Sequence, residues 1–194
     1  RRDHAADHRG SVLVRRTLLY ALGGLLLAGV IHIAIIFLVP YFATRDAWSA
    51  IAKLGAEGEF HILPLGDSGP DTLPALDPRL LHAVCRFSIA DNPIRIQAQL
   101  PSDFWSIAIF DRRGRNLYSL NDRSAERTQL DLALLTPEQT TQMREDPPAS
   151  LEQAVVIELP VQAGFAVLRV LVADDSMLPA ATRALQGANC AATL

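Results

Sequence analysis

The stretch that decides the architecture is residues 18–39, which read LLYALGGLLLAGVIHIAIIFLV. These 22 residues carry no Asp, Glu, Lys or Arg, and only three glycines and one histidine fall outside the apolar set. As an α-helix the stretch is roughly 33 Å long, enough to cross a hydrocarbon core of about 30 Å. The sequence therefore predicts one transmembrane helix over residues 17–43. Tyr41, Phe42 and Trp48 mark its far end as interfacial aromatic residues.

Charge is distributed unequally on the two sides of this helix. Residues 1–16, a basic tail, hold five arginines against two aspartates, whereas residues 40–194 hold 13 basic and 19 acidic residues. By the positive-inside rule the amino end is cytoplasmic and the remainder lies in the periplasm of a bacterial cell. The apolar run exceeds the length of a signal-peptide core and no small-x-small cleavage site follows it. We therefore expect a retained anchor in the inner membrane, with a cleaved leader, including a twin-arginine signal at Arg15-Arg16, as the alternative.

One face of the predicted span carries small residues. Gly24, Ala28 and His32 recur at every fourth position and so share a helix face. Small residues let a second helix approach closely, and a histidine can hydrogen-bond across such a contact. We expect this face to pack against a partner protein's helix or a second copy of this chain. The alternative is a neutral His32 that bonds a backbone carbonyl, and a metal or haem ligand is less favoured.

The outer part of the chain is predicted to hold a linker and one β-rich domain. Residues 44–78 read as a short helix, starting at Thr44 and stopped by Gly55, that extends the anchor or lies along the interface, followed by a linker rich in proline and glycine. From Arg79 the apolar period changes to two, as in residues 94–100, which read IRIQAQL. Residues 79–194 are therefore expected to form a mainly antiparallel sandwich or partly open barrel with two short helices.

The boundaries of the expected elements follow from turn and capping signals. Residues 81–89 and 94–100 are expected to form a hairpin around the loop 90–93, and Gly114 is expected to take a positive φ in the turn after a central strand. The capping box from Thr136 to Gln139 starts one helix, and Gly187 stops the other. The expected strands cover residues 81–89, 94–100, 104–110, 116–120, 127–134, 154–159 and 165–173.

Composition narrows the function classes. The chain is 49% hydrophobic and 20% charged, with a formal net charge of −3 and two cysteines. These values argue against a disordered tail, a disulfide-dense scaffold, a four-cysteine zinc site and a strongly basic nucleic-acid binder. Outside the cytoplasm, Cys85 and Cys190 are expected to form a disulfide worth about 4–5 kcal/mol by chain entropy. The alternative is one buried thiol and one exposed thiol.

Few motifs suggest chemistry. The segment from Gly66 to Pro70 is similar to the nucleophile segment of chymotrypsin-like proteases, but it lacks one glycine and a partner histidine, so Ser68 is interpreted as a turn residue. His4 and His8 have a spacing that could hold a metal on a helix, but they are interpreted as part of the charged cytoplasmic tail. We find no catalytic dyad, phosphate loop or metal cage and therefore expect no catalytic residue and no cofactor.

An arginine-rich turn is the most suggestive charged feature. Its side chains could bind an anionic lipid head group, a glycan or an acidic partner surface, although a solvated hairpin tip is the plainer alternative. The first hairpin is expected to add a polar face that includes His82. The residues of the turn are Arg112, Arg113, Arg115, Arg123 and Arg127, and those of the polar face are Arg86, Arg95, Gln97 and Gln99.

Three runs resemble a known family of bacterial envelope proteins. They are residues 77–87 (DPRLLHAVCRF), 92–96 (NPIRI) and 104–114 (FWSIAIFDRRG), and the closing pattern over residues 169–190 is also similar. The resemblance is to short membrane-anchored proteins related to the domain of unknown function 1254 family, often paired with a second domain. Asn92 stands where longer relatives commonly have glycine. The resemblance implies a β-rich envelope domain of unsettled activity and transfers no catalytic residue.

We expect a non-enzymatic accessory or assembly subunit of an inner-membrane protein complex, in contact with membrane lipid and with no nucleic-acid partner. The alternative is a periplasmic binding module for a lipid, glycan or other envelope component. An enzyme that acts on envelope carbohydrate comes third, and a deep pocket in which Asp and His side chains converge would favour it.

Overall fold

The computed structural model describes residues 3–65, 76–101, 104–125, 129–145, 151 and 153–192, with the backbone alone for residues 3–14 and 40–47. It divides into two units, residues 1–43 and 44–194. The first unit and the start of the second share one helix, α1 (Asp3–Leu54). This helix runs through Pro40 and Thr44 without a break, so the expected helix start at Thr44 is wrong and the segment instead extends the first helix, the other expectation for it.

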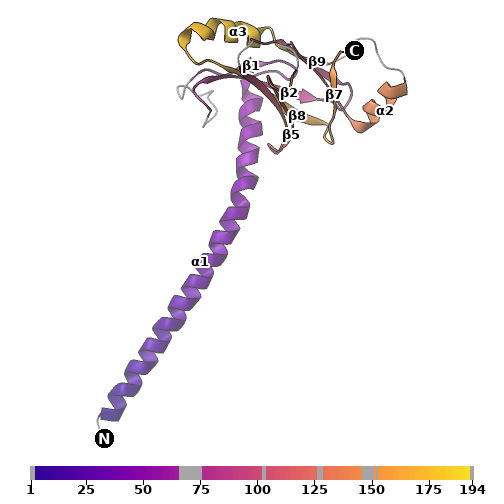
Figure 1. The fold of residues 1–194 in the computed structure, drawn as a ribbon. Helices are drawn as coiled ribbons and strands as arrows, with labels where there is room; N and C mark the ends of the chain where they lie inside the picture. The colour runs from indigo at the N-terminus through magenta and orange to yellow at the C-terminus, as the bar shows by residue number, and fades with distance from the viewer. Residues whose placement is uncertain are drawn as a thin grey trace. The chain divides into compact units, whose positions relative to one another are not determined.

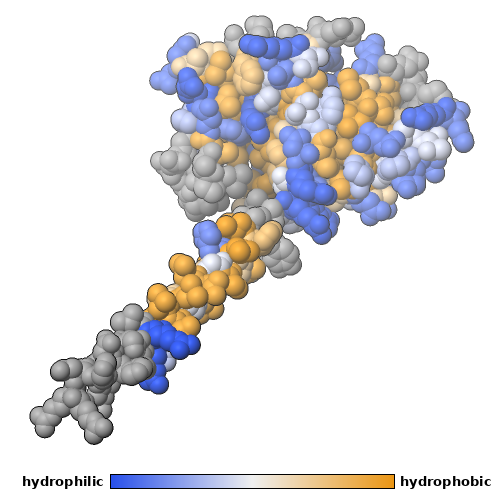
Figure 2. Space-filling model, turned by 60° about the horizontal axis from the view of Figure 1, so that its bottom comes forward, coloured by the Kyte–Doolittle hydropathy of each residue, from blue (hydrophilic) through white to orange (hydrophobic). Residues whose placement is uncertain are grey.

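The candidate membrane span lies within α1, at Arg15–Val39. Every described side chain along it is exposed, and Figure 2 shows the resulting apolar surface in orange. So much exposed aliphatic surface is unfavourable in water and is matched by a hydrocarbon environment. By length and composition, it is the one helix in the described part of the chain suited to crossing a membrane, a test that a signal helix also passes.

The second unit contains two β-sheets (Figure 1), which confirms the expected β-rich class. Sheet A is antiparallel throughout, whereas sheet B is antiparallel except for the parallel pair β6–β7. The order in sheet A is β1 (His61–Ile62), β2 (Leu80–Ser88), β8 (Ala163–Leu171), β4 (Trp105–Asp111) and β5 (Asn116–Asn121). The order in sheet B is β7 (Val155–Glu158), β6 (Gln129–Leu135), β3 (Ile94–Gln99) and β9 (Asn189–Ala192).

The main core lies between the two sheets. Alternate residues of β2, β4 and β8 in sheet A and of β3 and β6 in sheet B are buried together, as the period of two requires. Phe87 and Trp105 are the largest of these fully buried side chains. A disulfide between Cys85 of β2 and Cys190 of β9 links the two sheets, as expected from the sequence. Burial of the apolar faces and this covalent link together hold the sheets face to face.

The expected hairpin of residues 81–89 and 94–100 is wrong. β2 pairs with β8 in sheet A over all nine of its residues, while β3 pairs with β6 in sheet B. Both strands turn their apolar side chains, such as Phe87 and Ile96, into the same core, so the connection between them crosses from one sheet to the other. The single polar face expected along the hairpin is therefore divided: Arg86 lies on the outer side of sheet A and Arg95 on that of sheet B.

The short helices follow their capping signals. In α2 (Pro137–Glu145), the Thr136 N–H donates to Gln139 Oε1 at 2.9 Å and the Gln139 N–H donates to Thr136 Oγ1 at 3.3 Å, which confirms the capping box. A 3₁₀ turn, η2 (Asp175–Met177), precedes α3 (Leu178–Gln186), which is capped at Gly187. Gly114 has a φ of 74°, as expected for the turn after β4. β1 and β9 are strands that the sequence did not reveal.

Candidate functional site

The last turns of α1 cover part of the outer face of sheet A. Ile51 is buried there together with Val84 and Phe165. The Trp48 ring lies 6.3 Å from Phe165 between ring centroids, and Phe165 stacks on Phe110 at 5.1 Å. The guanidinium carbons of Arg86 and Arg112 lie 5.9 and 5.2 Å from the centroid of Trp48. Aromatic stacking and cation–π contacts thus fix the end of this helix on the sheet.

Beyond these aromatic rings, a polar row crosses three strands of the same face. Arg169 of β8 stands opposite His82 of β2 on one side and Ser106 of β4 on the other. The neighbouring row is apolar, with Val167 opposite Val84. Cross-strand neighbours have Cβ atoms about 4.5–5.5 Å apart. The register therefore sets one cation and one imidazole side by side, next to an apolar row.

A pocket of about 450 Å³ opens on this face, and we call it the sheet A pocket. Volumes of about 300–1,000 Å³, mostly apolar lining and a few placed polar groups are typical of ligand sites. A smaller pocket of about 80 Å³ shares four lining residues with it, Leu76, Asp77, Leu80 and His82. The lining of the sheet A pocket is Ile51, Leu63, Leu76, Asp77, Leu80, His82, Val84, Phe110, Gly114, Phe165, Val167 and Arg169.

His82 is the one buried histidine among the residues described, with 5% of its surface exposed. Burial lowers the pKa of its imidazole below the ordinary 6.5, and the positive charge of Arg169 lowers it further. The backbone of Leu80 and the charge of Asp77 act in the opposite direction without reversing the shift. The ring is therefore neutral at pH 7, with one nitrogen that can donate a hydrogen bond and one that can accept.

Asp77 is the acidic group at this pocket. Its Oδ1 accepts a hydrogen bond from the Arg79 N–H at 2.9 Å, and the residue is exposed to solvent. In the described part of the chain, no hydrogen bond joins Asp77 to His82 and no ion pair joins it to Arg169. Asp77 and His82 thus both line the pocket, the feature expected for the enzyme alternative, but without the Asp–His hydrogen bond of a catalytic triad.

The arginine-rich turn lines a second pocket, of about 360 Å³, at the end of β4. The Asp111 carboxylate organises this turn by accepting from the N–H groups of Arg113 and Arg115 at 2.8 and 2.9 Å and from Arg115 Nε at 2.6 Å. Burial would raise the pKa of Asp111, but these bonds together hold it below the ordinary value. Arg112, Arg113 and Arg115 line the pocket with Ser88 and Gln162.

The other predicted site residues are dispersed. Arg123 is exposed in the turn after β5 and does not line the arginine pocket, and Arg127 lies outside the described residues, as does Ser68. Gly24, Ala28 and His32 are all exposed on α1. The side chains of His4 and His8 are not among those described. Over the described ranges, no group of three or more His, Cys, Asp or Glu side chains could hold a metal ion.

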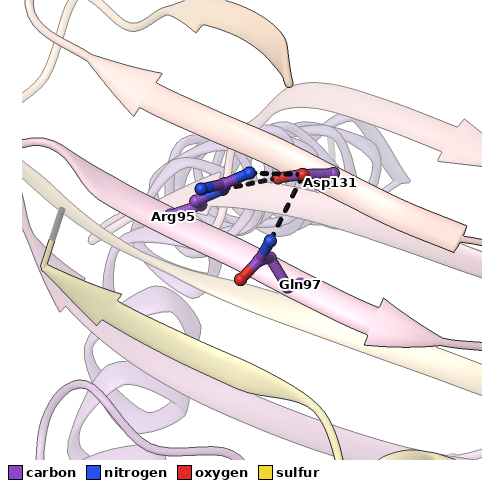
Figure 3. Close-up of polar contacts among 3 residues, drawn as sticks. All are labelled: Arg95, Gln97 and Asp131. Carbon is purple, nitrogen blue, oxygen red and sulfur yellow. Dashed lines mark hydrogen bonds and ion pairs between the residues drawn. The ribbon is translucent and has the colours of Figure 1, made fainter. Parts of the chain in front are cut away.

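The outer face of sheet B carries a different polar arrangement (Figure 3). Arg95 of β3 makes a bidentate ion pair with Asp131 of β6, with Nε–Oδ1 at 2.8 Å and a second N–O distance of 2.7 Å. Gln97 donates to Asp131 Oδ2 at 3.3 Å. The hydrogen bonds from Arg95 hold the pKa of Asp131 below 3.8, although burial opposes the shift. All the charge in this cluster is compensated internally.

Sequence reasoning did not identify His82 and Arg169 as residues of one pocket. His82 was interpreted as part of an exposed hairpin face, and Arg169 was not singled out. A usable signal was present, because Arg169 is the one charged residue in the run from 163 to 173, AGFAVLRVLVA. A lone cation within a strand that is otherwise apolar marks a charge held at a protein surface or site.

Comparisons with known proteins agree with this fold. No curated protein matches the chain. The VPA0106 protein from Vibrio parahaemolyticus has a similar crystal structure, with a TM-score of 0.53 at 12% identity, covering 79% of this chain and 36% of that one. A putative uncharacterized protein from Burkholderia cenocepacia is similar at 16% identity with a TM-score of 0.38, covering 52% of this chain and 28% of that one.

The chain spans about a third of the length of both solved proteins, and the first likeness supports the fold alone. The family model described as protein of unknown function (DUF1254) matches residues 60–192, which include both sheets and both residues of the disulfide. This is the family that the three sequence runs indicated. The chain therefore belongs to the DUF1254 family.

Proposed function

We propose that this chain is a single-pass protein of the bacterial inner membrane whose periplasmic domain is a non-enzymatic binding module for an amphiphilic envelope component. The sheet A pocket is the observation that carries the proposal. It is large enough for a ligand, its lining is mainly aliphatic and aromatic, and it holds one cation. An alkyl chain gains free energy from such a surface in proportion to the apolar area that leaves water.

The proposed location rests on charge and on the disulfide. The arginines before the candidate span favour a cytoplasmic amino end. The Cys85–Cys190 disulfide is typical of an oxidising compartment such as the periplasm. An anchored domain on that side of the membrane meets amphiphiles at high local concentration.

Photolabelling of the full chain in lipid nanodiscs tests the proposal. Palmitic acid that carries a diazirine in its alkyl chain should label the tryptic peptide of residues 80–86, because Leu80, His82 and Val84 line the pocket. Val167→Trp fills the pocket and should reduce this labelling to the level seen without light. Val155→Trp is the matched control, since Val155 is 49% exposed on β7 of sheet B.

Equal labelling of peptide 80–86 in the wild type and Val167→Trp, both folded by their thermal transitions, would contradict the binding module. The same mass spectra report any chemical change in the probe. A modified probe would favour the third candidate, an enzyme, for which the convergence of Asp77 and His82 at the pocket is the supporting observation.

The second candidate is an accessory subunit of a membrane protein complex. The face of Gly24, Ala28 and His32 supports it, because it is exposed along α1 and an added Cβ at Gly24 meets no atom within 4 Å. Affinity purification in mild detergent should recover partner membrane proteins in stoichiometric amounts. The variant Gly24→Leu/Ala28→Leu should lose them, and Gly23→Leu/Ala34→Leu, on the opposite side of the helix, should keep them. Unchanged partners in the first variant would count against this face.

A further inference from the structure

We infer that the sheet A pocket selects amphiphiles with a single negative charge, of the long-chain carboxylate class, through an ion pair between the ligand head group and Arg169. This inference rests on the proposed function and names the ligand of the same pocket. Its basis is the position of Arg169, the one arginine that lines the pocket.

Arg169 makes no ion pair with any carboxylate among the described residues. Its two cross-strand neighbours, His82 and Ser106, are uncharged at neutral pH, and the residue is half-buried. The two ion pairs found in the described residues, Arg95–Asp131 and Arg115–Asp111, lie elsewhere. A guanidinium presents a fork of N–H donors that fits a carboxylate in two parallel hydrogen bonds. A partly desolvated cation of this kind favours an anion from the ligand.

The apolar lining gives the second half of the specificity. Val84 and Val167 form the row next to His82 and Arg169, and Phe165 lies one row further on the same face, so a head group at Arg169 leaves its alkyl chain on aliphatic and aromatic surface. The imidazole of His82, next to Arg169, is neutral at pH 7, so Arg169 is the cation of the polar row that a carboxylate can pair with. Head group and chain are therefore both matched by groups on one sheet face.

Asp77 limits the negative charge that the pocket accepts. Its carboxylate is exposed at the pocket and is not paired with Arg169. One ligand charge can therefore pair with Arg169, while a second would face Asp77 without a cation of its own. Like charges at close range are unfavourable in a partly buried site. The pocket should thus prefer a carboxylate to an alkyl phosphate, which approaches two charges at neutral pH.

Three diazirine probes of equal chain length, a carboxylic acid, an alcohol and a phosphate, test this selectivity on the full chain in nanodiscs. Labelling of peptide 80–86 by the acid should exceed that by the alcohol by about tenfold or more, the value of one charge-assisted hydrogen-bond pair. Arg169→Gln should remove the difference while labelling by the alcohol persists. Arg144→Gln, at an exposed arginine of α2, is the matched control and should keep it. Asp77→Asn should raise labelling by the phosphate.

The possible outcomes separately test the role of Arg169, the preference for a single charge and the binding module itself. Equal labelling by the acid and the alcohol in the wild type would overturn the role of Arg169 and leave the binding module intact. Stronger labelling by the phosphate than by the acid would overturn the preference for a single charge. Labelling by none of the probes above the Val167→Trp background would reject the binding module itself, and with it this inference.

Discussion

The outer faces of the two sheets differ in how they accommodate a partly buried arginine. Each carries an arginine on a strand with partners on both sides, Arg169 in sheet A and Arg95 in sheet B. In sheet B the strand opposite supplies Asp131, and the charge is neutralised within the fold. In sheet A the neighbours are His82 and Ser106, which supply no negative charge. This difference is the reason why we propose a ligand for the face of sheet A and assign the Arg95–Asp131 pair of sheet B to the stability of the fold.

The helices that cover the two faces reinforce this contrast. In sheet B, Ala133 and Leu135 form a closed cluster with Leu151, against which Met143 of α2 packs. In sheet A, the end of α1 covers the aromatic end of the face with Ile51 and leaves a pocket beside it. A packed cluster leaves no room for a ligand, whereas a partly covered one provides a wall for it.

The largest expected effect comes from uncoupling the two sheets. Replacement of both Cys85 and Cys190 by serine removes a link across 105 residues and should lower the free energy of unfolding by about 4–5 kcal/mol. Guanidinium unfolding in nanodiscs, followed by the fluorescence of the buried Trp105, measures this loss. Wild-type protein with reductant should behave like the variant. Equal stability with and without reductant would contradict the structural role of the disulfide.

A substitution at the aromatic end of the sheet A face should cause the next largest loss of stability. Phe165→Ala removes a ring that is 6% exposed and contacts both Trp48 and Phe110, so it should cost about 3 kcal/mol. The same unfolding assay measures it. Val156→Ala, at an exposed position of β7, is the control and should cost less than about 0.5 kcal/mol. A Phe165→Ala loss as small as that of the control would mean that α1 does not dock on this face.

The two arginines give the sharpest test of the comparison. Arg95→Gln breaks a bidentate ion pair with exposures of 23% and 11% and should cost about 1–2 kcal/mol. Arg169→Gln should change stability by less than about 0.5 kcal/mol, because no described carboxylate loses a partner. Both values come from unfolding without added ligand. A loss for Arg169→Gln equal to that for Arg95→Gln would show that its charge is already compensated.

The smallest expected effect is the pH dependence of the stability that Asp131 contributes. The pKa of Asp131 in the folded state lies below its ordinary 3.8, so the unfolded chain takes up this proton more readily. Its contribution to stability is therefore full above the unfolded pKa and is lost as the pH falls through the folded pKa. Asp131→Asn lacks this titration, so the difference in Tm between wild type and variant should narrow from pH 7 to pH 3. A constant difference would show that the ion pair does not set the pKa.

Local signals in the sequence predicted most elements but not their partners. The period of two in residues 94–100 and the capping box at Thr136 each depend on residues only a few positions apart in the chain, and both were interpreted correctly. β9 has four residues and gains its place only by pairing with β3, more than 90 residues away, so no local pattern marks it. The hairpin error has the same cause, because a turn signal at residues 90–93 does not say whether the chain returns to the same sheet.

By itself, the sequence determined the candidate span, the β-rich class of the outer domain, the family and the two cysteines that form the disulfide. These depend on composition, on short periods and on motifs that stay contiguous in the chain. Only the tertiary structure decided which charges meet. His82 and Arg169 are 87 positions apart and become neighbours through the register of β2 with β8. Pairing of distant strands is set by the packing of the whole core, and it is this pairing that separates the neutralised Arg95 from the available Arg169.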